Sequence, residues 1–279
     1  MSQSGAMAEA AFEIIRPAGP RVPVVAHIPH ASTSIPDDIR AELLVPDPEL
    51  AEELVRLTDW FTDELFAGLR ELGATLFVNR YSRLVFDPER FLDETAEPMA
   101  ARGQGVVYWQ GSQRQPLREP SVELRKRRIQ QLYLPYHAAL DALVGELLTE
   151  SGACTIVDCH SFPSVPLPSE IDQAAGRPDI CLGTDELHTP SLLADGLEAA
   201  FAAEGLRVAR DRPFRGTFVP SGYHRRDARV RSVMIEVRRG LYLDEVRAER
   251  LPAFAAVAAA IGRVLARVVV AEEQSPGTP

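Results

Sequence analysis

The chain has 279 residues, of which 46% are hydrophobic, enough apolar material to fill the core of one large domain. Its formal net charge of −10 argues against nucleic acid as a partner, because phosphate binding requires a cationic surface. No apolar run is long enough to cross a membrane. The three cysteines, Cys154, Cys159 and Cys181, lack CxxC spacing and indicate reduced thiols in a cytoplasmic protein.

The expected organisation is one domain between two tails. We predict a disordered tail over residues 1–15, a single α/β domain over 16–272 and a second disordered tail over 273–279. The domain opens with a strand over 21–28, where β-branched and apolar residues run up to a Pro-His pair. His30 therefore stands where this strand ends.

Helical periodicity follows between residues 47 and 72, with leucine and phenylalanine at three- and four-residue steps until Gly73. On one unbroken helix, Asp59 would lie nearly opposite this apolar stripe and face solvent. If Thr58 instead caps a fresh helix, Asp59 stands at its first position and can face a site beside the sheet. The periodicity leaves both interpretations open.

The middle of the chain combines a second strand, a long irregular segment and a long helix. Residues 74–79 predict the strand, and an arginine-rich segment over 80–90 follows it. Residues 91–120 carry scattered Gly, Gln and Pro and predict a long loop or lid, a feature that is usually functional. The strongest helix is predicted over 121–151, and Gly152 ends it.

The stretch Cys154–His160 is an apolar strand that ends in an acid and a histidine. Residues two apart on a strand share a face, so Ile156, Asp158 and His160 point the same way. In an open parallel sheet, ligands bind outside the carboxyl ends of the strands. Asp158 and His160 therefore offer chemistry where ligands are expected to bind.

A third polar strand is predicted over residues 231–239, with Glu236 in a β-branched run. A carboxylate there is costly to bury unless it is paired, for which Arg238 on the same face is available, or used in catalysis. Strands over 179–183 and 206–210 and helices over 190–204 and 244–270 complete the chain. The alternation predicts an α/β fold, with a mainly parallel, mixed central sheet and helices on both faces.

Two strand-terminal histidines, His30 and His160, indicate one site built from two strands. A hydrolytic zinc site takes three His or carboxylate ligands and needs a further carboxylate as a base. Asp59 or Asp158 would complete the ligands, and Glu236 would be the base. The residues alone leave the choice between the two aspartates open.

Two other hydrolase mechanisms are disfavoured. Cys159 and His160 are adjacent on a strand, so their side chains point to opposite faces and cannot bond to each other. No GxSxG motif indicates a serine hydrolase.

Six motifs, in this order, resemble the N-formylglutamate amidohydrolase family over residues 20 to 250. They are Val24–Pro36, Thr58–Leu65, Asn79–Arg90, Asp158–Ser161, Pro213–Gly216 and Ile235–Tyr242. The family is similar in fold to zinc carboxypeptidases and zinc-dependent peptidoglycan amidases. Carried over residue by residue, the resemblance implies one zinc ion per chain on His30, Asp59 and His160, with Glu236 as the base. Asp158, two residues before His160 on the same face, is the other candidate ligand, or it orients His160 without contacting the metal.

The resemblance further implies a small anionic N-acyl amino acid as substrate, with N-formyl-L-glutamate as the first candidate and a place in histidine degradation. Planar arginine forks suit its carboxylates. The family usually reads Asp-x-Asn-Arg where this chain has Glu89, whose charge would repel an anion. The alternatives are hydrolysis of a peptide or peptidoglycan-type amide and a non-catalytic metabolite-binding role. The candidate carboxylate-binding residues are Arg80, Arg83, Arg90, Arg215 and Arg238.

Overall fold

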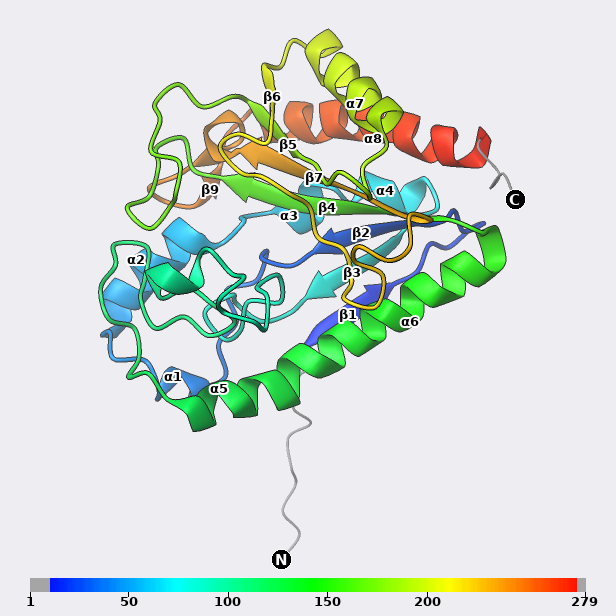
Figure 1. The fold of residues 1–279 in the computed structure, drawn as a ribbon. Coiled ribbons are helices and arrows are strands. Elements are labelled where there is room, and N and C mark those ends of the chain that lie inside the picture. The colour runs from blue at the N-terminus through cyan, green and yellow to red at the C-terminus, as the bar shows by residue number, and fades with distance from the viewer. Residues whose placement is uncertain (1–10, 275–279) are drawn as a thin grey trace, which may run out of the picture.

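The structure is a computed structural model that describes residues 11–274, and it is built around one seven-stranded sheet (Figure 1). The strand order is β1-β3-β2-β4-β7-β5-β6. The four central strands, β3, β2, β4 and β7, run parallel, whereas β1 and the β5–β6 pair run in the opposite direction. The predicted mainly parallel, mixed sheet is confirmed. The strands are β1 Phe12–Ile15, β2 Val24–Ile28, β3 Thr75–Asn79, β4 Cys154–Phe162, β5 Ile180–Gly183, β6 Val208–Arg210 and β7 Val230–Arg238.

Both ends of the described chain differ from the predicted tails. Residues 12–15 form the edge strand β1, and Phe12 stacks on Phe77 of β3 with 5.2 Å between the ring centroids. A strand of four residues is too short to show a periodicity, so the sequence pattern missed it. The last helix, α8 (Phe254–Gln274), includes residues 273 and 274. The rest of the two predicted tails lies outside the described residues.

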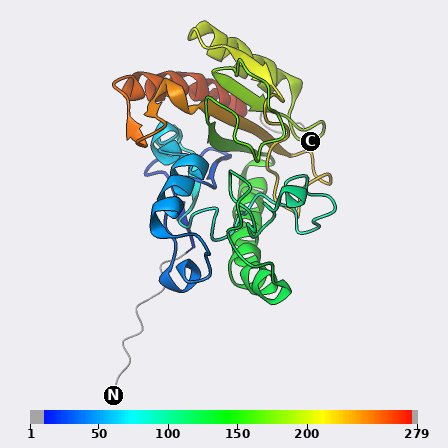
Figure 2. The same cartoon turned by 90° about the vertical axis from the view of Figure 1, so that its left-hand side faces the viewer.

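Helices cover both faces of the sheet (Figures 1 and 2). One face packs against α3 (Thr62–Leu65), α4 (Gly68–Glu71), α7 (Ser191–Ala203) and α8, and the other against α6 (Leu134–Ser151). β4 alternates between these two cores, since Val157 and Cys159 enter the first and Cys154 and Ile156 the second. Asp158 and His160 thus share the face of Ile156, as predicted.

The chain between residues 47 and 72 does not form one helix. α2 (Asp47–Leu57) ends at Thr58, whose φ of −76° and ψ of 136° are extended, and α3 begins only at Thr62. Of the two interpretations left open, the one with a break at Thr58 is correct, although the helix resumes three residues later than a first helical position at Asp59 requires. Asp59 therefore lies in the break, where it is buried.

The long predicted helix contains a π-helical turn. α5 (Val122–Arg128) begins at Ser121, whose hydroxyl accepts the Leu124 amide, and the turn η2 (Ile129–Tyr133) joins it to α6. Gly152 ends α6 with a φ of 77°, the left-handed conformation that favours glycine. The predicted bounds are confirmed, but the π-helical turn leaves no mark in the hydrophobic pattern.

The irregular segment 91–120 is fastened to α2. Glu53 of α2 is fully buried and accepts hydrogen bonds from the Ser112 amide, the Ser112 hydroxyl and, at 3.1 Å, the Gln115 amide group. The segment contains a short helical turn, η1 (Ala100–Arg102), and two isolated β-bridges, Gln104–Tyr108 and Gln110–Pro116. It therefore packs as a fixed wall beside the carboxyl ends of the parallel strands (Figure 1).

Four short elements complete the described chain. The last helix starts later than predicted, because the turn η3 and the β8–β9 hairpin occupy residues 239–250. None of the helices within residues 11–274 is both long and apolar enough to span a bilayer. The short elements are α1 Asp37–Arg40, η3 Arg239–Leu241, β8 Leu243–Asp244 and β9 Glu249–Arg250.

Candidate metal centre and active site

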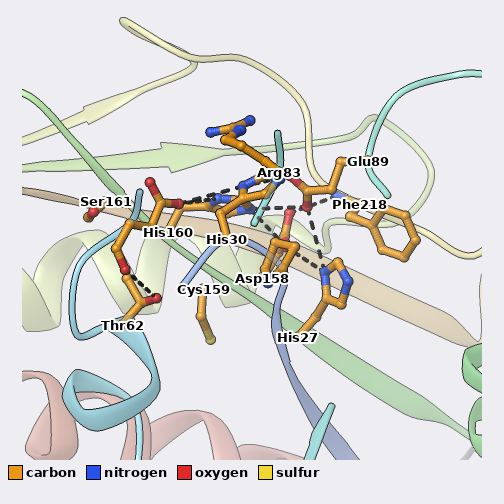
Figure 3. Close-up of polar contacts among 12 residues, drawn as sticks. His27, His30, Thr62, Arg83, Glu89, Asp158, Cys159, His160, Ser161 and Phe218 are labelled. Carbon is orange, nitrogen blue, oxygen red and sulfur yellow. Dashed lines mark hydrogen bonds and ion pairs between the residues drawn. The ribbon is translucent and has the colours of Figure 1, made fainter. Parts of the chain in front are cut away.

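Sheet register places the polar side chains of three strands side by side. His27 of β2 lies opposite Asp158 of β4, and His160 of β4 lies opposite Glu236 of β7. The three strands are parallel, so their carboxyl ends meet at one edge of the sheet, where ligands bind in open α/β folds. We call these side chains, with those that contact them, the histidine–carboxylate cluster, and Figure 3 shows His27, His30, Asp158 and His160 of it.

Asp59 reaches the cluster from the break between α2 and α3. Its backbone amide donates to the carbonyl of His30 at 3.0 Å. Its Oδ2 lies 3.0 Å from Nδ1 of His160 and 3.7 Å from Nδ1 of His30. Its Oδ1 accepts from a guanidinium nitrogen of Arg239 at 2.8 Å. Arg239 thus holds one oxygen of Asp59 and leaves the other directed at two histidines.

His30 has one bound and one unpaired ring nitrogen. Nε2 lies 3.0 Å from Oδ1 of Asp87, so the proton of a neutral imidazole belongs on Nε2. The other oxygen of Asp87 accepts from the Tyr108 hydroxyl at 2.7 Å and from Arg83 at 2.9 Å. Nδ1 of His30 is buried without a hydrogen-bond partner among the described residues. A buried lone pair facing the Asp59 carboxylate is the arrangement that a metal ligand requires.

Asp158 orients two histidines at once. Its Oδ1 lies 2.9 Å from Nδ1 of His27 and 3.1 Å from Nε2 of His160, and its Oδ2 accepts the Phe218 amide at 3.1 Å. His27 is held on its other side by the Tyr136 hydroxyl of α6 at 2.7 Å. His27 was not among the predicted site residues, although it lies in the same motif as His30 and points to the same face of β2 as Val25.

Glu89 also lies in the site, although it was not among the predicted site residues. Its Oε1 lies 3.0 Å from Nε2 of His160 and 3.6 Å from Nδ1 of His27, and its Oε2 lies 3.7 Å from Nδ1 of His30 (Figure 3). Among the described residues, two sets have ligand atoms all within 4.8 Å of one another: His30, Glu89 and His160, and His27, Glu89 and Asp158. Glu89 belongs to both sets.

Charge pairing shifts the acid–base behaviour of this cluster. Burial lowers the pKa of His160, but the charges of Glu89 and Asp158 outweigh burial and raise that pKa well above its ordinary value. Burial raises the pKa of Asp59, but the hydrogen bond to His160, the nearby His30 ring and the charge of Arg239 outweigh it and hold that pKa well below its ordinary value. A buried set of imidazole and carboxylate groups at this spacing could hold a metal ion.

The pKa of Glu236 is shifted in the direction opposite to that of Asp59. Burial raises its pKa to about 8, and its Oε2 has no hydrogen-bond partner among the described residues. Arg238, the alternative ion-pair partner, instead donates to Asp179 at 2.5 Å. The expected alternative of a Glu236–Arg238 pair is therefore wrong.

The five candidate arginines separate into two groups. Arg83 and Arg90 reach the cluster, with guanidinium nitrogens 2.9 Å and 3.4 Å from Oδ2 of Asp87. Arg80 pairs with Glu13 of β1 on the far side of β3, and Arg215 is exposed on the loop before Phe218. The placements of Arg80 and Arg238 thus differ from the prediction, because their side chains are committed to surface and edge carboxylates.

A family model and two curated relatives point to one family. The family model described as N-formylglutamate amidohydrolase matches residues 22–243. The N-formylglutamate deformylase of Pseudomonas aeruginosa is 31% identical over 236 residues, which cover 81% of this chain and 84% of that protein. The N-formylglutamate deformylase of Pseudomonas putida is 28% identical over 235 residues, which cover 81% and 83%.

A solved structure extends the comparison to the whole fold. The crystal structure of N-formylglutamate amidohydrolase from Ralstonia eutropha JMP134 matches with a TM-score of 0.84 and 26% identity, covering 96% of this chain and 100% of that one. Together with a sheet edge that presents buried histidines and carboxylates, these matches establish the family. The chain belongs to the N-formylglutamate amidohydrolase family.

Proposed function

We propose that the protein is a zinc-dependent amidohydrolase that releases formate, or a similar small acid, from an N-acyl acidic amino acid. N-Formyl-L-glutamate is the first substrate to test, because two relatives bear the name of its deformylase. The observation that carries the proposal is the unpaired, buried Nδ1 of His30, which faces Asp59 beside His160. This donor set fits one zinc ion per chain.

In this proposal His30, Asp59 and His160 hold the metal, and Asp158 orients His160. The bound ion supplies Lewis acidity and lowers the pKa of water at the site. Asp87 keeps the proton of His30 on Nε2, and Arg239 keeps Oδ2 of Asp59 directed at both histidines. Each proposed ligand is thus oriented by a partner of its own, as metal sites require.

Glu236 is proposed as the general base. Its carboxylate would take a proton from the attacking water and pass it to the departing amine nitrogen, while the water oxygen bonds to the acyl carbon and the C–N bond breaks. A base must not be occupied by another donor, and Oε2 of Glu236 meets this condition among the described residues.

Arg83 and Arg90 are proposed to bind the carboxylates of the substrate. Both lie against the Asp87 side of the cluster, and Nε of Arg90 is buried without a partner among the described residues. A planar guanidinium can place two parallel hydrogen bonds on one carboxylate, which a lysine cannot reproduce. Arg215 is a further candidate because its exposed side chain lies on the loop that also contacts Asp158 through Phe218.

A panel of N-acyl amino acids, assayed with zinc-loaded and metal-stripped protein, tests the proposal. We expect turnover of N-formylglutamate only with metal, and loss of bound zinc in His30→Ala and His160→Ala. Arg83→Lys should raise KM strongly for acidic substrates and little for neutral N-formyl amino acids. Full zinc occupancy in both histidine variants would place the metal elsewhere, and zinc binding without turnover of any amide would indicate a binding protein instead.

A further inference from the structure

Glu89 holds a fixed position beside the two proposed histidine ligands. Helix α6 and the π-helical turn bind the carbonyls on either side of it, because His137 lies 2.8 Å from the Pro88 oxygen and the Tyr133 hydroxyl donates to the Arg90 oxygen at 2.9 Å. The amide of Glu89 itself donates to Oδ1 of Asp87 at 3.1 Å. The backbone is thus held on three sides, so the placement of this carboxylate is set by the fold.

Hydrogen bonding alone leaves Glu89 poorly satisfied. Its one close donor among the described residues is Nε2 of His160, and Asp158 competes for the same nitrogen at 3.1 Å. Asp158 has two further donors, His27 and the Phe218 amide, whereas the other contacts of Glu89 are 3.6 and 3.7 Å long. A carboxylate with one shared donor and a side chain only 12% exposed lacks the pairing that burial requires.

The free oxygen of Glu89 faces the free nitrogen of His30. Oε2 lies 3.7 Å from the unpaired Nδ1 of His30, the same separation as between that nitrogen and Oδ2 of Asp59. Ligand atoms on one tetrahedral cation are about 3.4 Å apart when each bond is near 2.1 Å, so both carboxylates lie at ligand spacing from His30. The same carboxylate completes a set with His30 and His160 that does not include Asp59, since Glu89 approaches Nε2 of His160 and Asp59 approaches Nδ1.

We infer that Glu89 is a fourth protein ligand of the metal, added to His30, Asp59 and His160 in the resting enzyme. This inference rests on the proposed function. Four protein ligands close a tetrahedral shell, and catalytic zinc sites keep a position open for water or substrate. Glu89 therefore holds the position that the substrate must take, and its partial exposure places it on the solvent side of the cluster.

The test compares metal binding by full-length Glu89→Gln and Glu94→Gln proteins. Both variants remove one negative charge from neighbouring positions of the chain, but Glu94 pairs with Arg125 outside the cluster. Each protein is stripped, reloaded with Zn²⁺ or Co²⁺, and measured for zinc affinity by chelator competition and for the visible d–d absorption of bound Co²⁺. Melting of the stripped proteins checks that both variants fold.

We expect Glu89→Gln to weaken zinc binding by at least about 10-fold, the lower end of the loss seen when a mere supporting partner is removed, and to change the Co²⁺ spectrum. Glu94→Gln should change neither. Unaltered affinity and spectrum in Glu89→Gln would overturn the fourth ligand, provided that His30→Ala has lost the metal. If His30→Ala also binds normally, the proposed metal site itself has failed.

Discussion

Asp158 and Glu236 stand on neighbouring parallel strands, both beside His160, yet their surroundings differ completely. Asp158 accepts from His27, His160 and the Phe218 amide. Burial raises its pKa, but the charge of His160 and these hydrogen bonds outweigh burial and hold that pKa far below its ordinary value. Glu236 has an unpartnered oxygen, and burial raises its pKa to about 8. Asp158 therefore stays ionised, whereas Glu236 can exchange a proton near neutral pH.

The largest effect expected from this difference concerns Glu236. Glu236→Gln keeps the shape of the side chain but removes the group that accepts the proton, so kcat should fall by about 10²- to 10⁴-fold. Zinc content and melting temperature of the loaded protein should stay near wild type. Steady-state kinetics with metal analysis on the same preparation decides the matter, and a normal kcat would remove Glu236 from the mechanism.

Asp158 should behave in the reverse manner. Asp158→Asn removes a charge that orients His27 and His160, so zinc affinity should fall by about 10- to 100-fold. At saturating zinc, kcat should drop much less than in Glu236→Gln. Chelator competition gives the affinity, and an unchanged value would show that the three hydrogen bonds of Asp158 serve folding alone.

Two adjacent arginines differ in the same way, because one of them contacts the proposed metal site and the other does not. Arg239 is 4% exposed and donates to Oδ1 of Asp59, to Ser161 at 3.1 Å and to the Arg56 carbonyl at 2.6 Å, whereas Arg238 binds Asp179. Lysine cannot reproduce this fork. Arg239→Lys should therefore weaken zinc binding about 10-fold, and Arg238→Lys should leave it unchanged. Equal zinc affinity in the two variants would contradict the role given to Arg239.

The smallest expected effect is a pH dependence of stability in metal-stripped protein. Because burial raises the pKa of Glu236 from 4.5 to about 8, the folded state binds more protons than the unfolded state between these values. Stability should therefore fall as the pH rises through this window. Glu236→Gln removes the titration, so its melting temperature should exceed that of wild type near pH 9 and match it near pH 5. Parallel melting curves across this range would count against the raised pKa.

Much of this site follows from the sequence because strand ends are local features. Asp158 and His160 follow a β-branched run, and the face they share follows from two-residue alternation, whereas His30 lies two residues beyond the end of β2. The fold class is equally readable, since strands alternate with helices. The carboxyl ends of the two strands that precede His30 and carry His160 then lie close together because the strands run parallel in one sheet.

The remaining parts depend on contacts that local patterns do not encode. Asp59 faces the cluster because Thr58 and Phe61 break the helix. The φ of Phe61 is 62°, a conformation that a phenylalanine in the sequence does not predict. Glu89 enters the site because the π-helical turn η2 and helix α6 bind the two flanking carbonyls. The side chains of Arg80 and Arg238 do not point into the site, because they form ion pairs with Glu13 and Asp179.

The buried Glu53 restricts movement of the segment 91–120 beside the site. Its carboxylate is enclosed by α2 and by donors from Ser112 and Gln115, so lifting the segment would strip a buried charge of its partners. Such opening costs free energy on the scale of local unfolding, not of a hinge rotation. In hydrogen exchange, the Ser112 amide should consequently be among the slowest of residues 91–120. Substrate exchange then depends on the smaller motions of single side chains at the rim of the cluster, and turnover need not wait for a loop to open.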